Sequence, residues 1–137
     1  MDRVVIDSSV FIKLYIDEDY SGNAYRLREA YLSGDMSIIV PSILAYEVLN
    51  ALRYSGDYNE QELERISQDI REYGFDVFDM LTELAKNTVR MAKRYNITIY
   101  DASYVALAFM TNSSFYTADE ELIEKTKLPF VKHIREF

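Results

Sequence analysis

The sequence predicts an α/β protein, a three-layer α/β/α sandwich built around a central parallel sheet. Short runs of β-branched and apolar residues alternate with longer segments of helical periodicity, and no hairpin turn signal joins the strands. Strands that alternate with helices pair in parallel through right-handed crossovers, which place helices on both faces of the sheet. No internal repeat and no linker rich in glycine, proline or serine divides the chain, so we expect one domain over residues 1–137.

The first predicted strand is Val4-Val5-Ile6, which is apolar on both faces, as a central parallel strand should be. Further strands are predicted at residues 38–40, 75–78, 114–116 and 130–132. Helices are predicted at residues 8–15, 21–33, 41–55, 59–73, 80–95 and 102–111, with a short helix after Asp119. Sheets of this kind place their sites at the carboxyl ends of the strands. Asp7, which follows the first strand directly, therefore stands where a site is expected.

Composition narrows the functional classes. A chain of about 150 residues buries roughly 68–70% of its unfolded surface, so a sizeable core is available. The absence of cysteine excludes disulfides and thiolate metal sites. No apolar run approaches the ~20 residues of a membrane helix, and the start of the chain lacks a signal-peptide pattern, so we expect no membrane contact and a cytoplasmic location.

The net charge argues against a protein that binds nucleic acid through a broad basic surface. The formal net charge is -8 and the sequence pI is about 4.6, whereas affinity for a phosphate backbone comes largely from Lys and Arg. The objection weakens if part of the negative charge is concentrated where divalent cations bind and reverse it locally.

Three aspartates stand just before predicted helices: Asp7, Asp101 and Asp119. Each has an ordinary interpretation as an N-cap, because an aspartate oxygen accepts the free amides of a first helical turn. Capping and metal binding are compatible, since a cap at the end of a sheet can direct one oxygen outward. These residues are therefore candidates for either role.

Glu47 has no such interpretation, because it lies inside a predicted helix among apolar neighbours. We expect it to be at least partly buried, and a buried ionised carboxylate is costly unless it is paired or bound to metal. A pair with Arg53 is the alternative. Asn50, one turn further on, is either a residue that orients Glu47 or a metal-bound water, or a plain surface amide.

The segment after Asp101 is apolar on nearly every side through residue 110, which predicts a buried helix. A buried helix would start close to the end of the sheet and bring Asp101 toward the other carboxylates. Hard oxygen ligands of this kind suit Mg²⁺ or Mn²⁺, and four carboxylates can hold one or two such ions.

The remaining chemistry is limited. The single histidine, His133, excludes a metal-free ribonuclease with two imidazoles and is expected at a strand end. No glycine-rich phosphate loop is present. The helix at 80–95 is expected to bury one face and expose a second face that is either solvated or in contact with RNA. The predicted buried residues are Leu81, Leu84, Ala85, Thr88 and Ala92, and the exposed cations are Lys86, Arg90, Lys93 and Arg94.

Four segments carry a resemblance to a known family over essentially the whole chain: VVIDSSVFIK around Asp7, PSILAYEVLNAL around Glu47, YDASYVALA around Asp101 and YTADEEL around Asp119. Together they resemble the PIN domain family, and within it the VapC-type toxins of bacterial and archaeal toxin-antitoxin pairs. The resemblance implies a Rossmann-like parallel sheet and an acidic quartet formed by these four residues.

The same resemblance implies an Mg²⁺- or Mn²⁺-dependent endoribonuclease in which the hydroxyls of Ser9 and Thr117 support the quartet. It also implies a cytoplasmic homodimer that acts on RNA and is held inactive by a small antitoxin protein. Whether Glu120 or Glu121 adds a ligand stays open, as does the choice between a toxin and an RNA-processing nuclease.

Other classes fit less well. A phosphoacceptor receiver domain would carry an adjacent acidic pair after the first strand, but Ser8 follows Asp7. A phosphatase of the haloacid dehalogenase type would carry a second aspartate at position 9, where Ser9 stands. A non-catalytic PIN-like interaction module would tolerate the loss of acids, yet all four are present.

Overall fold

The structure is a computed structural model that describes residues 2–137, and its centre is a five-stranded sheet with the order β3-β2-β1-β4-β5. The strands are β1 (Asp2–Ile6), β2 (Met36–Pro41), β3 (Asp76–Phe78), β4 (Ser114–Thr117) and β5 (Val131–His133). All four strand pairings are parallel. The predicted parallel sheet is confirmed, and β1, whose Val4, Val5 and Ile6 are buried, lies at its centre.

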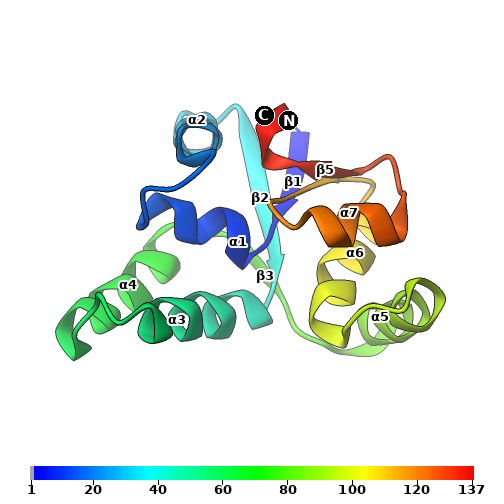
Figure 1. Cartoon of the computed structure of the whole chain (residues 1–137). Helices are drawn as coiled ribbons and strands as arrows, with labels where there is room; N and C mark the ends of the chain where they lie inside the picture. The colour runs from blue at the N-terminus through cyan, green and yellow to red at the C-terminus, as the bar shows by residue number, and fades with distance from the viewer. Residues whose placement is uncertain (1) are drawn as a thin grey trace.

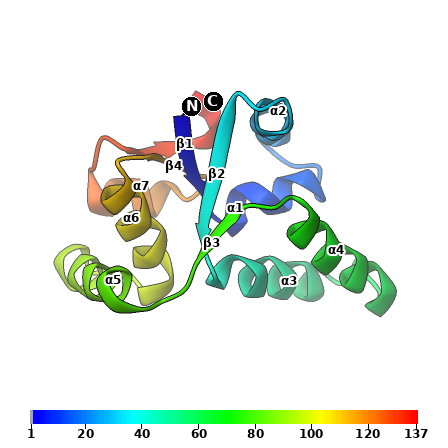
Figure 2. The same cartoon turned by 180° about the vertical axis from the view of Figure 1, so that it is seen from behind.

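Helices cover both faces of the sheet. They are α1 (Ser8–Phe11), α2 (Ser21–Leu32), α3 (Ile43–Ser55), α4 (Glu60–Glu72), α5 (Thr82–Tyr95), α6 (Ile99–Thr111) and α7 (Glu120–Thr126), with 3-10 turns η1 (Ile12–Leu14) and η2 (Ile134–Glu136). Figures 1 and 2 show α1 to α4 on one side of the sheet and α5 to α7 on the other, which is the predicted three-layer arrangement. The arrowhead of β2 points toward the end of the molecule where α3 and the start of α6 lie (Figure 1).

Two of the three predicted caps are confirmed. Asp7 accepts from the backbone N–H of Val10, and Asp119 accepts from that of Leu122. The prediction for Asp101 is wrong, because α6 begins earlier, at Ile99, and its N-cap is Thr98. Threonine is also a good cap, and its hydroxyl accepts from the N–H of Asp101 at 3.0 Å. Asp101 therefore lies in the first turn of α6, where a negative charge is favourable.

The helices also correct two predictions of burial. In α5, Leu84, Thr88 and Ala92 are buried as expected, but Leu81 is 65% exposed because it precedes the helix in extended backbone and so lies off the helical wheel. In α6, the residues from Ala102 to Ala108 are buried, whereas the last turn exposes Phe109 and Met110.

Ala85, also predicted to be buried, is only half-buried, and apart from these positions the predicted core is present. His133 is buried at the end of β5, as expected of a strand-end residue. The predicted helix at 8–15 is divided into α1 and η1. Within residues 2–137, no helix combines the length and the apolar character needed to cross a membrane.

Candidate active site

Asp7 is fixed at the carboxyl end of β1 by hydroxyl groups from two segments. Its Oδ1 accepts from Ser9 Oγ at 2.5 Å, and its Oδ2 accepts from Thr117 Oγ1 at 2.6 Å. The parallel pairing of β1 with β4, in register at Ile6 and Tyr116, brings Thr117 beside a residue 110 positions earlier in the chain. The Asp7 side chain is buried and held in one orientation by these contacts.

The same hydroxyls organise the turn after β4. Thr117 Oγ1 accepts from the N–H of Asp119 at 3.0 Å, and Ser9 Oγ accepts from the N–H of Ala118 at 2.9 Å. Ser9 and Thr117, both predicted as supporting residues, therefore connect the Asp7 carboxylate to the backbone that carries Asp119.

Glu47 lies on α3 and is half-buried, as expected of its position in that helix. Its Oε1 accepts a hydrogen bond from the hydroxyl of Tyr104, a residue of α6, at 2.6 Å. Tyr104 is 1% exposed, and its ring stacks on Phe115 with centroids 5.7 Å apart. The predicted alternative of an ion pair with Arg53 is not found in the described residues, because the Arg53 guanidinium instead lies over the ring of Tyr54.

Tyr104 is the residue of this site that sequence reasoning missed. A signal was available, because a tyrosine on a helix predicted to be buried needs a hydrogen-bond partner for its hydroxyl. The partner itself is 57 residues away in the chain, so the sequence alone did not indicate which polar group it would be.

Asp101 and Asp119 line one cavity of about 220 Å³ at the junction of α5, α6 and α7. Glu121 and Lys125 line it as well. Glu120, in contrast, pairs with Arg135 at 2.7 Å on the exposed side of α7. Of the two glutamates left open by the sequence, Glu121 is the one that lines this cavity.

The structure does not bring Asn50 into the same group. Asn50 is exposed and lines a separate cavity between α3 and α4, together with Arg53 and Tyr58. Asn50, one helical turn after Glu47, therefore lies toward α4 and not toward the carboxylates.

Burial and mutual repulsion raise the pKa values of three of the four acids. Burial raises the pKa of Asp7 to about 6, although the hydrogen bonds from Ser9 and Thr117 oppose the shift. Burial also raises the pKa of Glu47, which the Tyr104 hydrogen bond opposes and the charge of Asp101 reinforces. The pKa of Asp101 is raised by burial and by the charge of Asp119. Asp101 is therefore the centre of the electrostatic group, since its charge interacts with those of the other three acids.

The chemistry of this donor set fits a hard divalent cation. All the charged groups are carboxylates, and their mutual repulsion would be relieved by a positive ion. Among residues 2–137, no three Asp, Glu or His side chains lie close enough together to hold a metal ion as they stand. The charges of the carboxylates nevertheless interact, and Ser9, Thr117 and Tyr104 fix the orientations of Asp7 and Glu47.

Comparisons with known proteins agree with this architecture. The family profile described as PIN domain matches residues 4–128. A curated relative, Ribonuclease VapC3 of Pyrobaculum aerophilum, is 30% identical over 128 residues, which cover 90% of this chain and 94% of the relative.

Solved structures show the same fold. The crystal structure of PAE2754 from Pyrobaculum aerophilum superposes with a TM-score of 0.71 at 20% identity, covering 98% of this chain and 85% of that one. A chain from a toxin-antitoxin complex of Klebsiella pneumoniae also gives a TM-score of 0.71, at 16% identity, covering 93% of this chain and 94% of that one.

Proposed function

Because this chain belongs to the PIN domain family, we propose that it is an endoribonuclease that hydrolyses RNA phosphodiester bonds in the cytoplasm and serves as the toxin of a toxin-antitoxin pair. The observation that carries the proposal is the group of carboxylates at the carboxyl end of the sheet, in which the charge of Asp101 interacts with those of Asp7, Glu47 and Asp119. The relationship to a protein named as a ribonuclease supports RNA as the substrate.

We propose that Asp7, Glu47, Asp101 and Asp119 hold Mg²⁺ or Mn²⁺. A bound divalent ion would lower the pKa of an attacking water and stabilise charge on the phosphate and the leaving oxygen. The carboxylates also supply the negative charge that attracts the ion and that would otherwise repel the RNA phosphates.

The protein's own residues orient this site. Ser9 and Thr117 fix both oxygens of Asp7, and Tyr104 fixes one oxygen of Glu47. Because Tyr104 holds only Oε1 of Glu47, the second oxygen is left to bind the ion or to position the attacking water.

The substitution Asp101→Asn tests the site, since it removes one negative charge and nearly preserves shape. If the four acids share a metal site, the variant should lose RNA cleavage and should keep or raise its melting temperature in EDTA, because like charges no longer repel. It should also show a smaller increase in melting temperature when Mg²⁺ or Mn²⁺ is added. Asp57→Asn, at an exposed position, is the matched control. An active Asp101→Asn protein with a full response to metal would refute the site.

Product chemistry tests the reaction independently. Water as the nucleophile predicts 5′-phosphate and 3′-hydroxyl ends, and EDTA should abolish cleavage. Products that end in a 2′,3′-cyclic phosphate would refute a metal-dependent hydrolysis.

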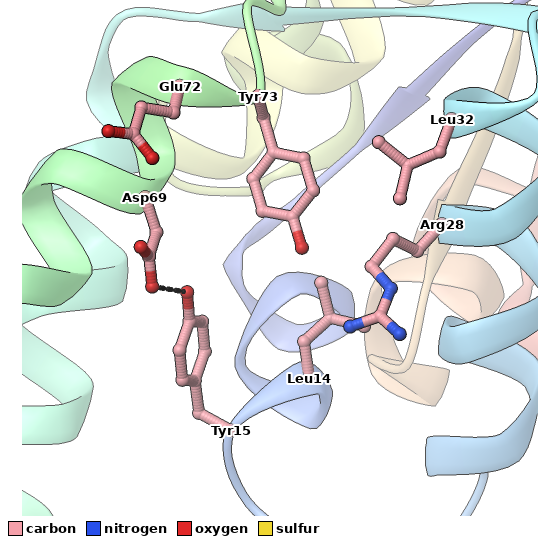
Figure 3. Close-up of a pocket in the computed structure, with 7 residues that line it drawn as sticks. All are labelled: Leu14, Tyr15, Arg28, Leu32, Asp69, Glu72 and Tyr73. Carbon is pink, nitrogen blue, oxygen red and sulfur yellow. Dashed lines mark hydrogen bonds between the residues drawn. The ribbon is translucent and has the colours of Figure 1, made fainter.

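We further propose that a small antitoxin protein covers the cavity of about 390 Å³ bounded by η1, α2 and α4. Figure 3 shows Arg28 from α2 and Tyr73 at the end of α4 reaching into this cavity from opposite sides. The cavity presents the cation Arg28 and the carboxylates of Asp69 and Glu72 to an occupant. Leu32, which is 59% exposed at the rim, offers apolar contact.

Coexpression with the product of an adjacent small reading frame tests this partner. Leu32→Glu should weaken the complex and release nuclease activity, because it places an unpaired charge in the apolar contact. Val89→Glu, at an exposed apolar position of α5 on the opposite side of the sheet, serves as control. A chain that is harmless when produced alone, or a complex insensitive to Leu32→Glu, would argue against the toxin assignment.

We also propose that two copies of the chain form a homodimer through an apolar surface at the junction of α3, β3 and α6. A cavity of about 230 Å³ in this surface is lined by exposed apolar residues that include Tyr46, Phe78, Met80, Ile99 and Tyr100, and the exposed Leu81 follows Met80 in the chain. Contiguous exposed apolar surface of this kind marks interaction sites. The surface adjoins the first turn of α6, which carries Asp101.

A further inference from the structure

The helices α4 and α5, on opposite sides of the sheet, carry opposite charge. α4 contains five acidic and two basic residues, whereas α5 contains one acidic residue, Glu83, and four basic residues. In a protein with a net charge of -8, α5 is therefore a local exception. A polyanion that approaches the carboxylates would be repelled by α4 and attracted by α5.

The cations of α5 gather on one face. Lys86, Arg90 and Arg94 are spaced four residues apart, which places them along one line of the helix at intervals of about 6 Å. Lys93 lies beside that line. All four are exposed, and the helix packs against α6 through the opposite face, where Leu84, Thr88 and Met91 are among the buried residues.

Most of these cations have no acidic partner among the described residues. Among residues 2–137, Lys86 forms one exposed pair with Glu83 at 3.5 Å, and the described ion pairs include no partner for Arg90, Lys93 or Arg94. Like charges four residues apart destabilise a helix by about 0.2–0.5 kcal/mol per pair. The arrangement therefore has a small cost in the free protein that a bound polyanion would remove.

The basic face leads to the candidate active site. Asn96, the C-cap of α5, lines the same cavity as Asp101 and Asp119. Lys125 Nζ lies 3.4 Å from the carbonyl oxygen of Asn96 and lines that cavity too. Lys125 pairs with Glu121 at 3.3 Å and is still the cation that lies between the end of α5 and the carboxylates of this cavity.

We propose that the substrate RNA crosses the outward face of α5, with Lys86, Arg90 and Arg94 in contact with its phosphates, and reaches Asp101 and Asp119 past Lys125. The proposal rests on the proposed ribonuclease function and specifies the path of its substrate. Contacts to phosphates carry affinity but no sequence information, so this face positions the RNA and leaves the choice of cleavage site to residues nearer the carboxylates.

The test compares two double variants that remove the same charge. Arg90→Ala with Arg94→Ala alters the proposed path, and Arg65→Ala with Arg71→Ala alters exposed arginines of α4. Binding of a fluorescein-labelled single-stranded RNA is measured by anisotropy at several salt concentrations, and cleavage of the same RNA is followed on gels.

The α5 variant should bind RNA roughly tenfold more weakly, and the slope of log affinity against log salt should fall in magnitude by about 1.4, as expected for two lost phosphate contacts on a single strand. Its melting temperature should be unchanged or higher, because like-charge repulsion is relieved. The α4 variant should bind as wild type does, and Arg90→Lys with Arg94→Lys should retain most of the affinity.

The outcomes separate the two proposals. If wild type binds and cleaves RNA but the α5 and α4 variants bind equally well, the path over α5 is refuted and the nuclease function stands. If RNA is bound with the predicted difference between variants but never cleaved, the path is supported and the proposed activity fails. Equal weakening in both variants would indicate a general charge effect and would also refute the path.

Discussion

Asp7 combines a buried carboxylate with two hydroxyl donors, and the balance between these influences determines its charge. Burial disfavours the ionised form, and the hydrogen bonds from Ser9 and Thr117 favour it, yet the pKa still rises from 3.8 to about 6. Near neutral pH the residue is ionised at the expense of stability. Binding of a divalent cation would offset this loss in the free energy of unfolding, so metal affinity is coupled to folding.

The stability of the metal-free protein should therefore depend on pH through Asp7. Because the folded-state pKa lies above 3.8, the free energy of unfolding falls as pH rises through about 6 and recovers as pH is lowered toward 3.8. In EDTA at pH 8, Asp7→Asn should raise this free energy by up to about 3 kcal/mol, since asparagine still caps α1.

Denaturant melts of wild type and Asp7→Asn in EDTA at pH 8 and pH 4.5 measure the effect. The difference in unfolding free energy between the two proteins should shrink at the lower pH. A difference that stays constant across this range would show that Asp7 is not the group responsible.

The hydrogen bond from Tyr104 lowers the pKa of Glu47, whereas burial raises it. Tyr104→Phe should raise the pKa of Glu47 further and move the acid limb of the pH-rate profile to higher pH. The ring should stay in place through its stacking on Phe115.

The matched control is Tyr31→Phe, which removes a hydrogen bond of the same length, 2.6 Å, from the hydroxyl to the Tyr73 carbonyl oxygen. It should lower stability by a similar amount and leave the pH-rate profile unmoved. If both variants shift the profile equally, Tyr104 has a structural role alone.

At the scale of elements, the start of α6 determines where Asp101 lies. Thr98 caps this helix and lines the cavity that contains Asp101. Thr98→Ala should cost about 1 kcal/mol of stability and should also lower RNA cleavage, because fraying of the first turn displaces Asp101.

A second N-cap provides the comparison. Asn59→Ala removes the capping box of α4 and should cost a similar amount of stability while activity at 25 °C remains. Thr98→Ser should restore both properties. Loss of activity in Asn59→Ala to the same extent would mean that general stability, and not the position of Asp101, explains the effect.

The elements also show what the sequence could predict. The alternation of strands and helices was sufficient to predict the parallel sheet, and the location of Asp7 and Asp119 after β1 and β4 followed from it. The start of α6 was not predictable, because Thr98 and Asp101 are both residues that cap helices and local propensity does not choose between them. The Tyr104 contact with Glu47 joins two helices from opposite sides of the sheet, α6 and α3, and no local pattern encodes such a contact.

At the scale of the whole molecule, the apolar surface around Leu81 lies next to the carboxylates. If it forms the homodimer contact, Leu81→Lys should give a monomer, because a lysine amine would be buried without a partner. Light scattering coupled to gel filtration measures the mass. Val89→Lys, on an exposed and apolar position of α5, is the control and should leave the mass unchanged. A wild-type protein that is monomeric at high concentration would remove the basis of this prediction.

The pairing of β1 with β4 has a consequence for biosynthesis. Thr117, which orients Asp7, and Asp119 emerge from the ribosome more than a hundred residues after Asp7. At about 5–20 residues per second, translation separates Asp7 from Asp119 by roughly 6–22 s. A nascent chain or a prematurely released fragment lacks the last strand pairing and with it the complete acidic group. A nuclease built in this way would spare the ribosome and the message that produce it until Asp119 has been synthesised.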